Sequence, residues 1–164
     1  MFVFSIKASK RKIITHMVLI IVLIIILGLF FITINGSNNE AMCQMGKYNL
    51  NAKDNNERIN FLSQFGWEVA NEPTEVVTVT IPSEFNSTYE KYNDIQKEQG
   101  LDLYKYREKT CTRYTYQVLN YKDASSGVRA NLLVINEKVI GGDISSVTLN
   151  GFIHGFCNPE KIHT

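Results

Sequence analysis

An apolar run without a single charged side chain, residues 13–34, constrains this chain more than any other feature. It is dense in Ile, Leu, Val and Phe. A helix rising about 1.5 Å per residue would cover roughly 33 Å over this run, enough to cross the ~30 Å hydrocarbon core of a bilayer. A chain in lipid must satisfy its own backbone hydrogen bonds. The run therefore predicts a transmembrane helix from Ile13 to Ile34, with the lipid bilayer as its partner.

The charges that precede this run predict its orientation. Lys7, Lys10, Arg11 and Lys12 come before it, and no acidic residue does. The positive-inside rule then predicts a single-pass protein of the cell membrane, with a cytoplasmic tail over residues 1–12 and an extracellular C-terminal domain. We favour an uncleaved signal anchor, because the run exceeds the apolar region of a signal peptide and no A-x-A pattern follows it. A cleaved signal peptide is the alternative.

The rest of the chain reads as one folded domain. All 16 acidic residues lie beyond the apolar run, so this part is net acidic and offers no basic stripe for nucleic acid. Residues 35–53 are rich in Asn and Gly without periodicity, which predicts a linker. The domain is expected over residues 54–157, followed by a short tail over residues 158–164.

Hydrophobic periodicity predicts the elements of the domain. A helix is expected from Asp54 to Gly66 and a second from a cap at Ser83 to Gly100, separated by a strand over residues 76–81. Strands follow over residues 110–121, 128–134 and 139–149. This order predicts an α+β fold, with two helices packed on one face of an antiparallel sheet of about four strands that ends in a three-strand meander. The Gly141-Gly142 pair predicts a β-bulge that switches the inward face.

Short segments spread over the domain resemble one known family. They include Phe65-Gly66-Trp67-Glu68-Val69, Gln99-Gly100-Leu101-Asp102-Leu103, Arg113-Tyr114-Thr115-Tyr116, Ala130-Asn131-Leu132-Leu133-Val134 and Val139-Ile140-Gly141-Gly142-Asp143. Over roughly residues 55–156 the chain is similar to the bacterial family labelled domain of unknown function 4830, typical of Gram-positive Firmicutes. The resemblance implies a membrane-tethered extracytoplasmic protein. It brings no functional residues with it.

Three cysteines leave the thiol state open. Cys111 opens one predicted strand and Cys157 follows the last, at opposite ends of a meander, so a bond between them is unexpected because a disulfide needs Cα atoms within ~7 Å. Cys43 lies in the predicted linker, from which it could reach either partner or another molecule. We favour three free thiols.

The sequence His154-Gly155-Phe156-Cys157 is the nearest approach to a catalytic pair or a metal half-site. A nucleophilic cysteine needs a base within hydrogen-bond reach and a third group to orient it, and a structural zinc site needs four ligands. The sequence supplies one close pair and nothing complementary, so ordinary terminal residues are favoured. No cofactor motif is present either, because Gly141-Gly142-Asp143 lacks the glycine spacing and the strand-to-helix context of a phosphate loop.

Five residues are the remaining interaction candidates: Tyr106, Arg113, Tyr116, Asp143 and His154. Tyrosines gather near one predicted strand, and tyrosine is enriched at interfaces, although plain packing is the favoured explanation of such a cluster. An inward carboxylate at Asp143 would need a partner such as Arg113. The preferred hypothesis is a non-enzymatic binding or accessory module at the bacterial cell envelope, with a protein or envelope component as partner. The alternative is an enzyme or thiol-dependent protein that uses Cys157 and His154.

Overall fold

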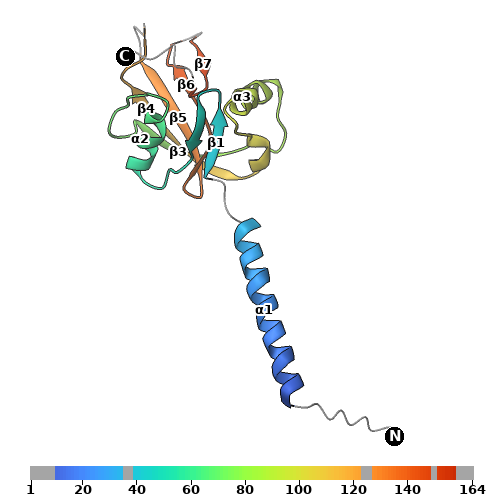
Figure 1. Ribbon diagram of the computed structural model, residues 1–164. Coiled ribbons are helices and arrows are strands. Elements are labelled where there is room, and N and C mark those ends of the chain that lie inside the picture. The colour runs from blue at the N-terminus through green and yellow to red at the C-terminus, as the bar shows by residue number, and fades with distance from the viewer. Residues whose placement is uncertain (1–9, 35–38, 123–126, 149–150, 158–164) are drawn as a thin grey trace. The chain divides into compact units, whose positions relative to one another are not determined.

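The computed structural model describes residues 10–34, 39–122, 127–148 and 151–157 (Figure 1). The chain divides into two compact units, Met1–Asn38 and Asn39–Thr164. The first unit contains helix α1 (Lys10–Ile34), whose described side chains run from Ile14 to Leu27. All of these are exposed. No helix within the fully described residues is long and apolar enough to cross a membrane.

The second unit is built around a five-stranded antiparallel sheet. Its strands lie side by side in chain order: β3 (Glu75–Thr80), β4 (Thr110–Val118), β5 (Val128–Ile135), β6 (Lys138–Ser146) and β7 (Ile153–His154). The α+β class and the antiparallel meander β4–β5–β6 are thus confirmed. The sheet has one strand more than expected, because the short β7 pairs with Ile144 and Ser145 of β6.

Strand alternation and turn chemistry explain the meander. Val128, Ala130, Leu132 and Val134 of β5 are all buried on one face, as the period of two predicts. The chain reverses between β5 and β6 at Asn136-Glu137. Both residues have positive φ, 48° and 64°, which matches the two-residue turns that suit the twist of paired strands.

The predicted bulge lies in β6, directly before the two glycines. Val139 pairs with Val134, whereas Gly141 pairs with Leu133, so Ile140 is the extra residue. A bulge of this kind shifts the side-chain alternation by one position. Asp143 consequently pairs with Asn131 and shares its face of the sheet, instead of continuing the face of Val139.

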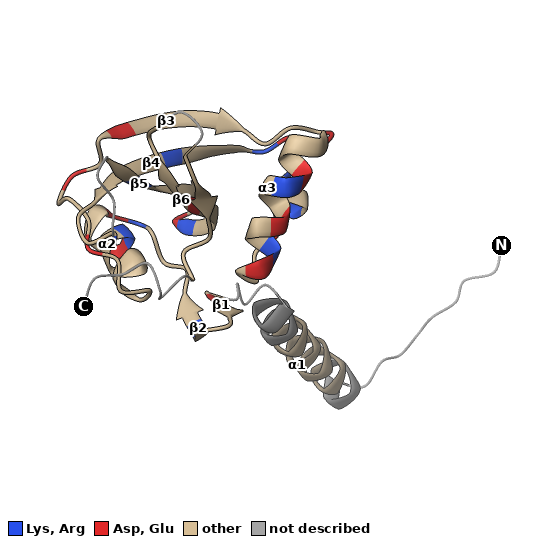
Figure 2. Cartoon of the chain, turned by 90° about the horizontal axis from the view of Figure 1, so that it is seen from above, with Lys and Arg blue, Asp and Glu red and all other residues tan. Residues whose placement is uncertain are grey.

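The two helices of this unit cover opposite faces of the sheet (Figure 2). On one face, α2 (Asn55–Ser63) packs Phe61 and Leu62 against Leu132 and its neighbours. On the other, α3 (Ser87–Glu98) and the 3-10 helix η1 (Leu103–Tyr106) lie over Leu133. The prediction of two helices on one face is wrong. Both faces of the central strands are apolar, and periodicity within a helix does not tell which face it covers.

Each of the two helices begins at a polar cap residue, but only one of these caps lies at the predicted position. The Asp54 side chain accepts a hydrogen bond of 2.9 Å from the backbone N–H of Glu57, as predicted for α2. The prediction of Ser83 as the cap of α3 is wrong. Asn86 caps that helix and accepts from the backbone N–H groups of Thr88 and Tyr89, at 3.1 and 3.0 Å. Asn caps as well as Ser, so spacing alone did not separate the two positions.

Residues 39–53 are part of the domain, so the predicted linker over residues 35–53 is wrong there. Strands β1 (Glu40–Cys43) and β2 (Gly46–Asn49) form a hairpin that turns at residues 44–45, directly before Gly46 with its φ of 114°. Tyr48 is buried and packs edge-on against the rings of Phe61 and Phe65. Only residues 35–38 of the predicted linker lie outside the described residues.

Two of the three cysteines form a disulfide. Cys43 in β1 is bonded to Cys157, 114 residues later, with Cα atoms 6.7 Å apart. Cys111 is a free, buried thiol. The prediction of three free thiols is wrong, because the hairpin brings β1 beside the segment that follows β7. The exclusion of a Cys111–Cys157 bond is confirmed.

Candidate functional site

A pocket of about 320 Å³ lies between α3 and the sheet, on the face opposite α2. This volume is at the small end of the range for ligand sites. Its apolar walls are Val79 of β3, Ile81 directly after that strand, Leu103 of η1 and Leu133 of β5. Its polar lining includes Thr88, Tyr89 and Tyr92 from α3, with Arg113, Asn131 and Asp143 from three neighbouring strands.

Asp143 supplies a buried carboxylate, with 5% of the residue exposed. Its two oxygens accept hydrogen bonds from the Tyr92 hydroxyl and from the Asn131 side-chain amide, each 2.9 Å long. Burial raises the pKa of this carboxyl above its ordinary value, while the hydrogen bonds and the charge of Arg113 oppose that rise. The bulge in β6 is what places this carboxylate under α3.

A row of side chains across three strands fixes the orientation of the Asn131 amide. Thr115, Asn131 and Asp143 are paired directly in register. The Thr115 hydroxyl donates to the Asn131 oxygen at 2.8 Å, so the nitrogen of that amide is turned toward Asp143. Tyr92 completes the set from α3. Burial, followed by the charge of Asp143, raises the pKa of Tyr92 well above its ordinary value, which keeps its hydroxyl protonated as a donor.

Arg113 supplies the cation of the pocket. One terminal nitrogen donates to the Glu75 carboxylate at 2.6 Å, in a pair whose side chains are 37% and 46% exposed. The Nε–H is buried and has no hydrogen-bond partner among the described residues. Buried donors are rarely left unpaired, so this atom marks a place where an acceptor would fit.

Gln96 of α3 and Gln99, the cap at the C-terminal end of this helix, attach it to β6. The Gln96 side-chain oxygen accepts from the backbone N–H of Gly142 at 2.8 Å, and the Gln99 amide donates to the Gly142 carbonyl at 3.2 Å. A side chain at Gly142, where φ is 156°, would collide with the Asn131 backbone oxygen and the Phe156 ring. Glycine there leaves room for the β5 backbone and the Phe156 ring, whereas it is at Gly141 that a side chain would crowd Leu103 of η1 and Gln96 of α3.

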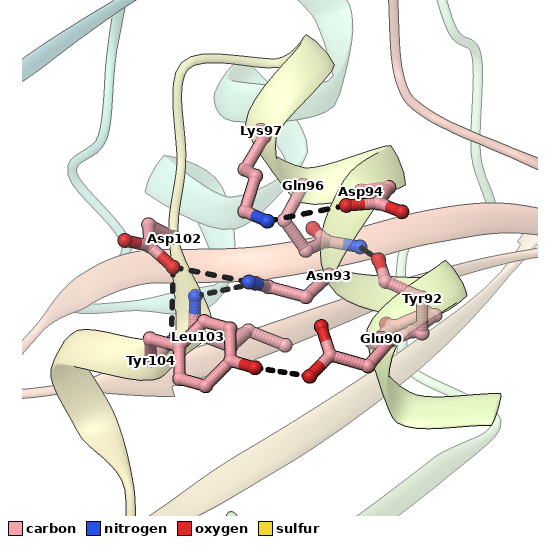
Figure 3. A network of polar contacts seen from close by, with 9 residues as sticks. All are labelled: Glu90, Tyr92, Asn93, Asp94, Gln96, Lys97, Asp102, Leu103 and Tyr104. Carbon is pink, nitrogen blue, oxygen red and sulfur yellow. Dashed lines mark hydrogen bonds and ion pairs between the residues drawn. The ribbon is translucent and has the colours of Figure 1, made fainter. Parts of the chain in front are cut away.

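A polar network on α3 also holds one pocket wall in place (Figure 3). The fully buried Asn93 accepts from the Leu103 backbone N–H at 2.8 Å and donates to Asp102 at 3.1 Å. At the edge of the network, the Tyr104 hydroxyl donates to the Glu90 carboxylate. These contacts position Leu103 in the pocket wall (Figure 3).

The structure brings together two of the five candidates expected from sequence, Arg113 and Asp143. Tyr106 packs at the margin of the apolar cluster on the same face but does not line the pocket. Tyr116 is fully buried on the opposite face, and His154 lies on β7. The sequence analysis singled out neither Tyr92 nor Asn131 as a site residue. The signal for Asn131 is an amide in the middle of an otherwise apolar strand.

Cys157 and His154, the pair named in the alternative hypothesis, do not form a site with a free thiol. The Cys157 sulfur is bonded to Cys43 and is therefore not available as a nucleophile. His154 lies with one ring nitrogen 3.2 Å from the Tyr121 hydroxyl, and its ring is stacked on that of Phe152. Within the described residues, no group of three or more His, Cys, Asp or Glu side chains is placed to hold a metal ion.

Comparison with known proteins places the pocket inside a family region. A family model described as "Domain of unknown function (DUF4830)" matches residues 61–144, more than half of the chain. All of the residues that line the pocket fall within this match. No curated protein and no solved structure matches the chain.

Proposed function

The chain belongs to the family Domain of unknown function (DUF4830), and on that premise we propose that it is a membrane-tethered binding module whose ligand occupies the pocket between α3 and the sheet. The observation that carries the proposal concerns Arg113, which lines a pocket with apolar walls and whose buried Nε–H has no partner among the described residues. Apolar walls with a few placed polar groups are typical of small-molecule sites.

The fixed state of the polar groups supports binding rather than proton transfer. Both oxygens of Asp143 already accept hydrogen bonds, from Tyr92 and Asn131. A general base needs its oxygen within hydrogen-bond reach of a substrate proton, and this carboxylate is instead engaged by two protein donors. It therefore serves to hold α3 and the pocket in shape.

The tether and the outer location belong to the same proposal. The uncharged residues 13–34, preceded by Lys7, Lys10, Arg11 and Lys12, favour a single-pass anchor with the domain outside the cytoplasm. The Cys43–Cys157 disulfide supports this location, because such bonds persist in oxidising compartments and are rare in the cytosol. The expected setting is the bacterial cell envelope, with a protein or an envelope component as partner.

In-cell cross-linking of the full-length tagged protein tests the proposal. Thr88→Trp places a large ring at an exposed position of the pocket rim, and Lys91→Trp places the same ring on α3 at an exposed position that does not line the pocket. We expect a stoichiometric partner that is lost in the first variant and kept in the second. An identical set of cross-linked molecules from both variants would reject the pocket as the binding site.

A further inference from the structure

We infer that the pocket binds the carboxylate of a small apolar acid, with Arg113 as the side chain that recognises it. This inference rests on the proposed function and adds the chemical class of the ligand. The acid is either a free aliphatic carboxylate or the C-terminal residue of a peptide. Both present a carboxylate beside a short apolar group.

The donor geometry of Arg113 favours a carboxylate. The Nε–H and the neighbouring terminal nitrogen form the edge of a guanidinium fork that fits a carboxylate with two parallel hydrogen bonds. The Nε–H lacks a partner among the described residues, and the terminal nitrogen already holds the Glu75 carboxylate at 2.6 Å. Glu75 is about half exposed, so water can replace this contact when a ligand carboxylate takes the fork.

The other charged group of the pocket argues against a cationic ligand. A ligand ammonium would need the Asp143 carboxylate, whose oxygens already accept from Tyr92 and Asn131. The group of the site that lacks a hydrogen-bond partner among the described residues is the Arg113 Nε–H donor, and a ligand would have to supply an acceptor for it.

The apolar walls determine the size and the character of the group attached to the ligand carboxylate. Val79, Ile81, Leu103 and Leu133 surround the pocket with branched aliphatic side chains. A volume of about 320 Å³ admits a branched chain of a few carbons together with the carboxylate. A leucine-like side chain beside a carboxylate meets both requirements.

The test uses the full chain in lipid nanodiscs, with empty nanodiscs as the blank, and titrates matched probes by ligand-observed NMR. The probes are 4-methylpentanoate and N-acetylleucine, each with its neutral amide. We expect one or both acids to bind at least about tenfold more tightly than the corresponding amide, since the amide cannot accept two charge-assisted hydrogen bonds. Binding of 4-methylpentanoate indicates a free acid, and binding of N-acetylleucine alone indicates a peptide C-terminus.

Variants assign the carboxylate contact. Arg113→Gln should weaken binding of the acid at least about tenfold, whereas Arg129→Gln, an exposed arginine on β5 outside the pocket, should leave it unchanged. Glu75→Gln should tighten binding, because it removes the negative charge that competes with the ligand for Arg113. A residue with a merely structural role would not give this gain.

The comparison of acid with amide on the unaltered chain does not depend on any variant folding. Equal binding of acid and amide, or no binding of either acid, overturns the inference. So does an unchanged affinity in a folded Arg113→Gln variant. None of these results affects the comparison of the cross-linked partners of Thr88→Trp and Lys91→Trp. That comparison tests the proposed function separately.

Discussion

The side-chain oxygen of Gln99 accepts a hydrogen bond of 2.6 Å from the backbone N–H of Phe156, 57 residues later in the chain. The same buried amide donates to the Gly142 carbonyl at 3.2 Å. One side chain on α3 thus satisfies backbone groups of two other segments. Neither of those groups can be solvated where it lies, so the amide is needed for stability.

Gln99→Ala should therefore destabilise the domain by about 2–4 kcal/mol, because it leaves a buried N–H and a buried C=O unpaired. Lys97→Ala, which removes an exposed ion pair with Asp94 and a cation–π contact of 5.7 Å with the Tyr104 ring, should change stability by less than about 0.5 kcal/mol. Urea unfolding of the full chain in detergent checks both. Trp67, the only tryptophan and fully buried, reports unfolding by fluorescence. Equal stability of the two variants would contradict the prediction.

Tyr116 should contribute through its hydroxyl as well as its ring. The hydroxyl accepts from Arg58 Nε at 2.9 Å and donates to Asn55 at 2.8 Å, on the α2 side of the sheet. Tyr116→Phe leaves a buried guanidinium donor without its acceptor, and we expect a loss of about 1–2 kcal/mol in the same unfolding assay. Tyr106→Phe is the control, since its hydroxyl makes no hydrogen bond to the described residues. The prediction fails if both changes have the same small effect.

The pH dependence of stability should carry a signature of Asp143. Burial raises the pKa of its carboxyl above the ordinary 3.8, so in the window above about pH 4 the folded state holds this proton more tightly than the unfolded state. Its contribution to stability is then present at low pH and falls as pH rises through the raised pKa.

The difference in unfolding free energy between the wild type and Asp143→Asn should therefore fall with pH in this window, with a slope of at most about 1.4 kcal/mol per pH unit. Other carboxylates affect both proteins alike and cancel in the difference. Unfolding curves between about pH 3.5 and 7 measure it. A difference that rises with pH would show that the hydrogen bonds and Arg113 outweigh burial.

Thiol counting should give one free cysteine for each chain. In the unfolded, unreduced protein we expect one alkylated residue, Cys111, and in the reduced protein three. In the folded state Cys111 should react slowly, because it is buried and burial raises the pKa of its thiol. Mass spectrometry after alkylation reads all three states. Three alkylated cysteines without reduction would disprove the disulfide.

Reduction of the disulfide should cost about 2–5 kcal/mol of stability, since the bond closes a long loop in the unfolded chain. Cys43→Ser should have a similar effect and should make the protein insensitive to reductant. Cys111→Ala should keep the sensitivity to reductant, whatever its own stability, because that thiol is not part of the bond.

The strands could be predicted because alternation and turn residues are local signals. Leu132 and Val134 mark the buried face of β5, and the glycines after Ile140 mark the bulge. Recognition of that bulge is also what made Asp143 a candidate with Arg113 as a neighbour. The helix cap at Asp54 was equally local.

The parts of the structure that the sequence did not predict depend on contacts between segments far apart in the chain. The hairpin that contains Tyr48 has four-residue strands and a glycine turn, which read as an unstructured segment until its packing against Phe61 is known. The buried side of α3 is polar, with Asn93, Gln96 and Gln99, and hydrophobic periodicity does not detect buried amides. That polar side positions the pocket. The sequence therefore predicted the strand residues Arg113 and Asp143 of the site but not the contribution of α3.

The bond between Cys43 and Cys157 also decides how the domain responds to mechanical force. The strands of the sheet and every residue of the pocket lie between these two cysteines in the sequence. A pull applied between the chain before Cys43 and the chain after Cys157 is carried by one covalent link. Residues 40–42 precede the bond, so their pairing with β2 does bear this tension. The hydrogen bonds of the five-stranded sheet lie between the two cysteines and are shielded from it, so the pocket keeps its geometry while the chain is stretched from its two ends.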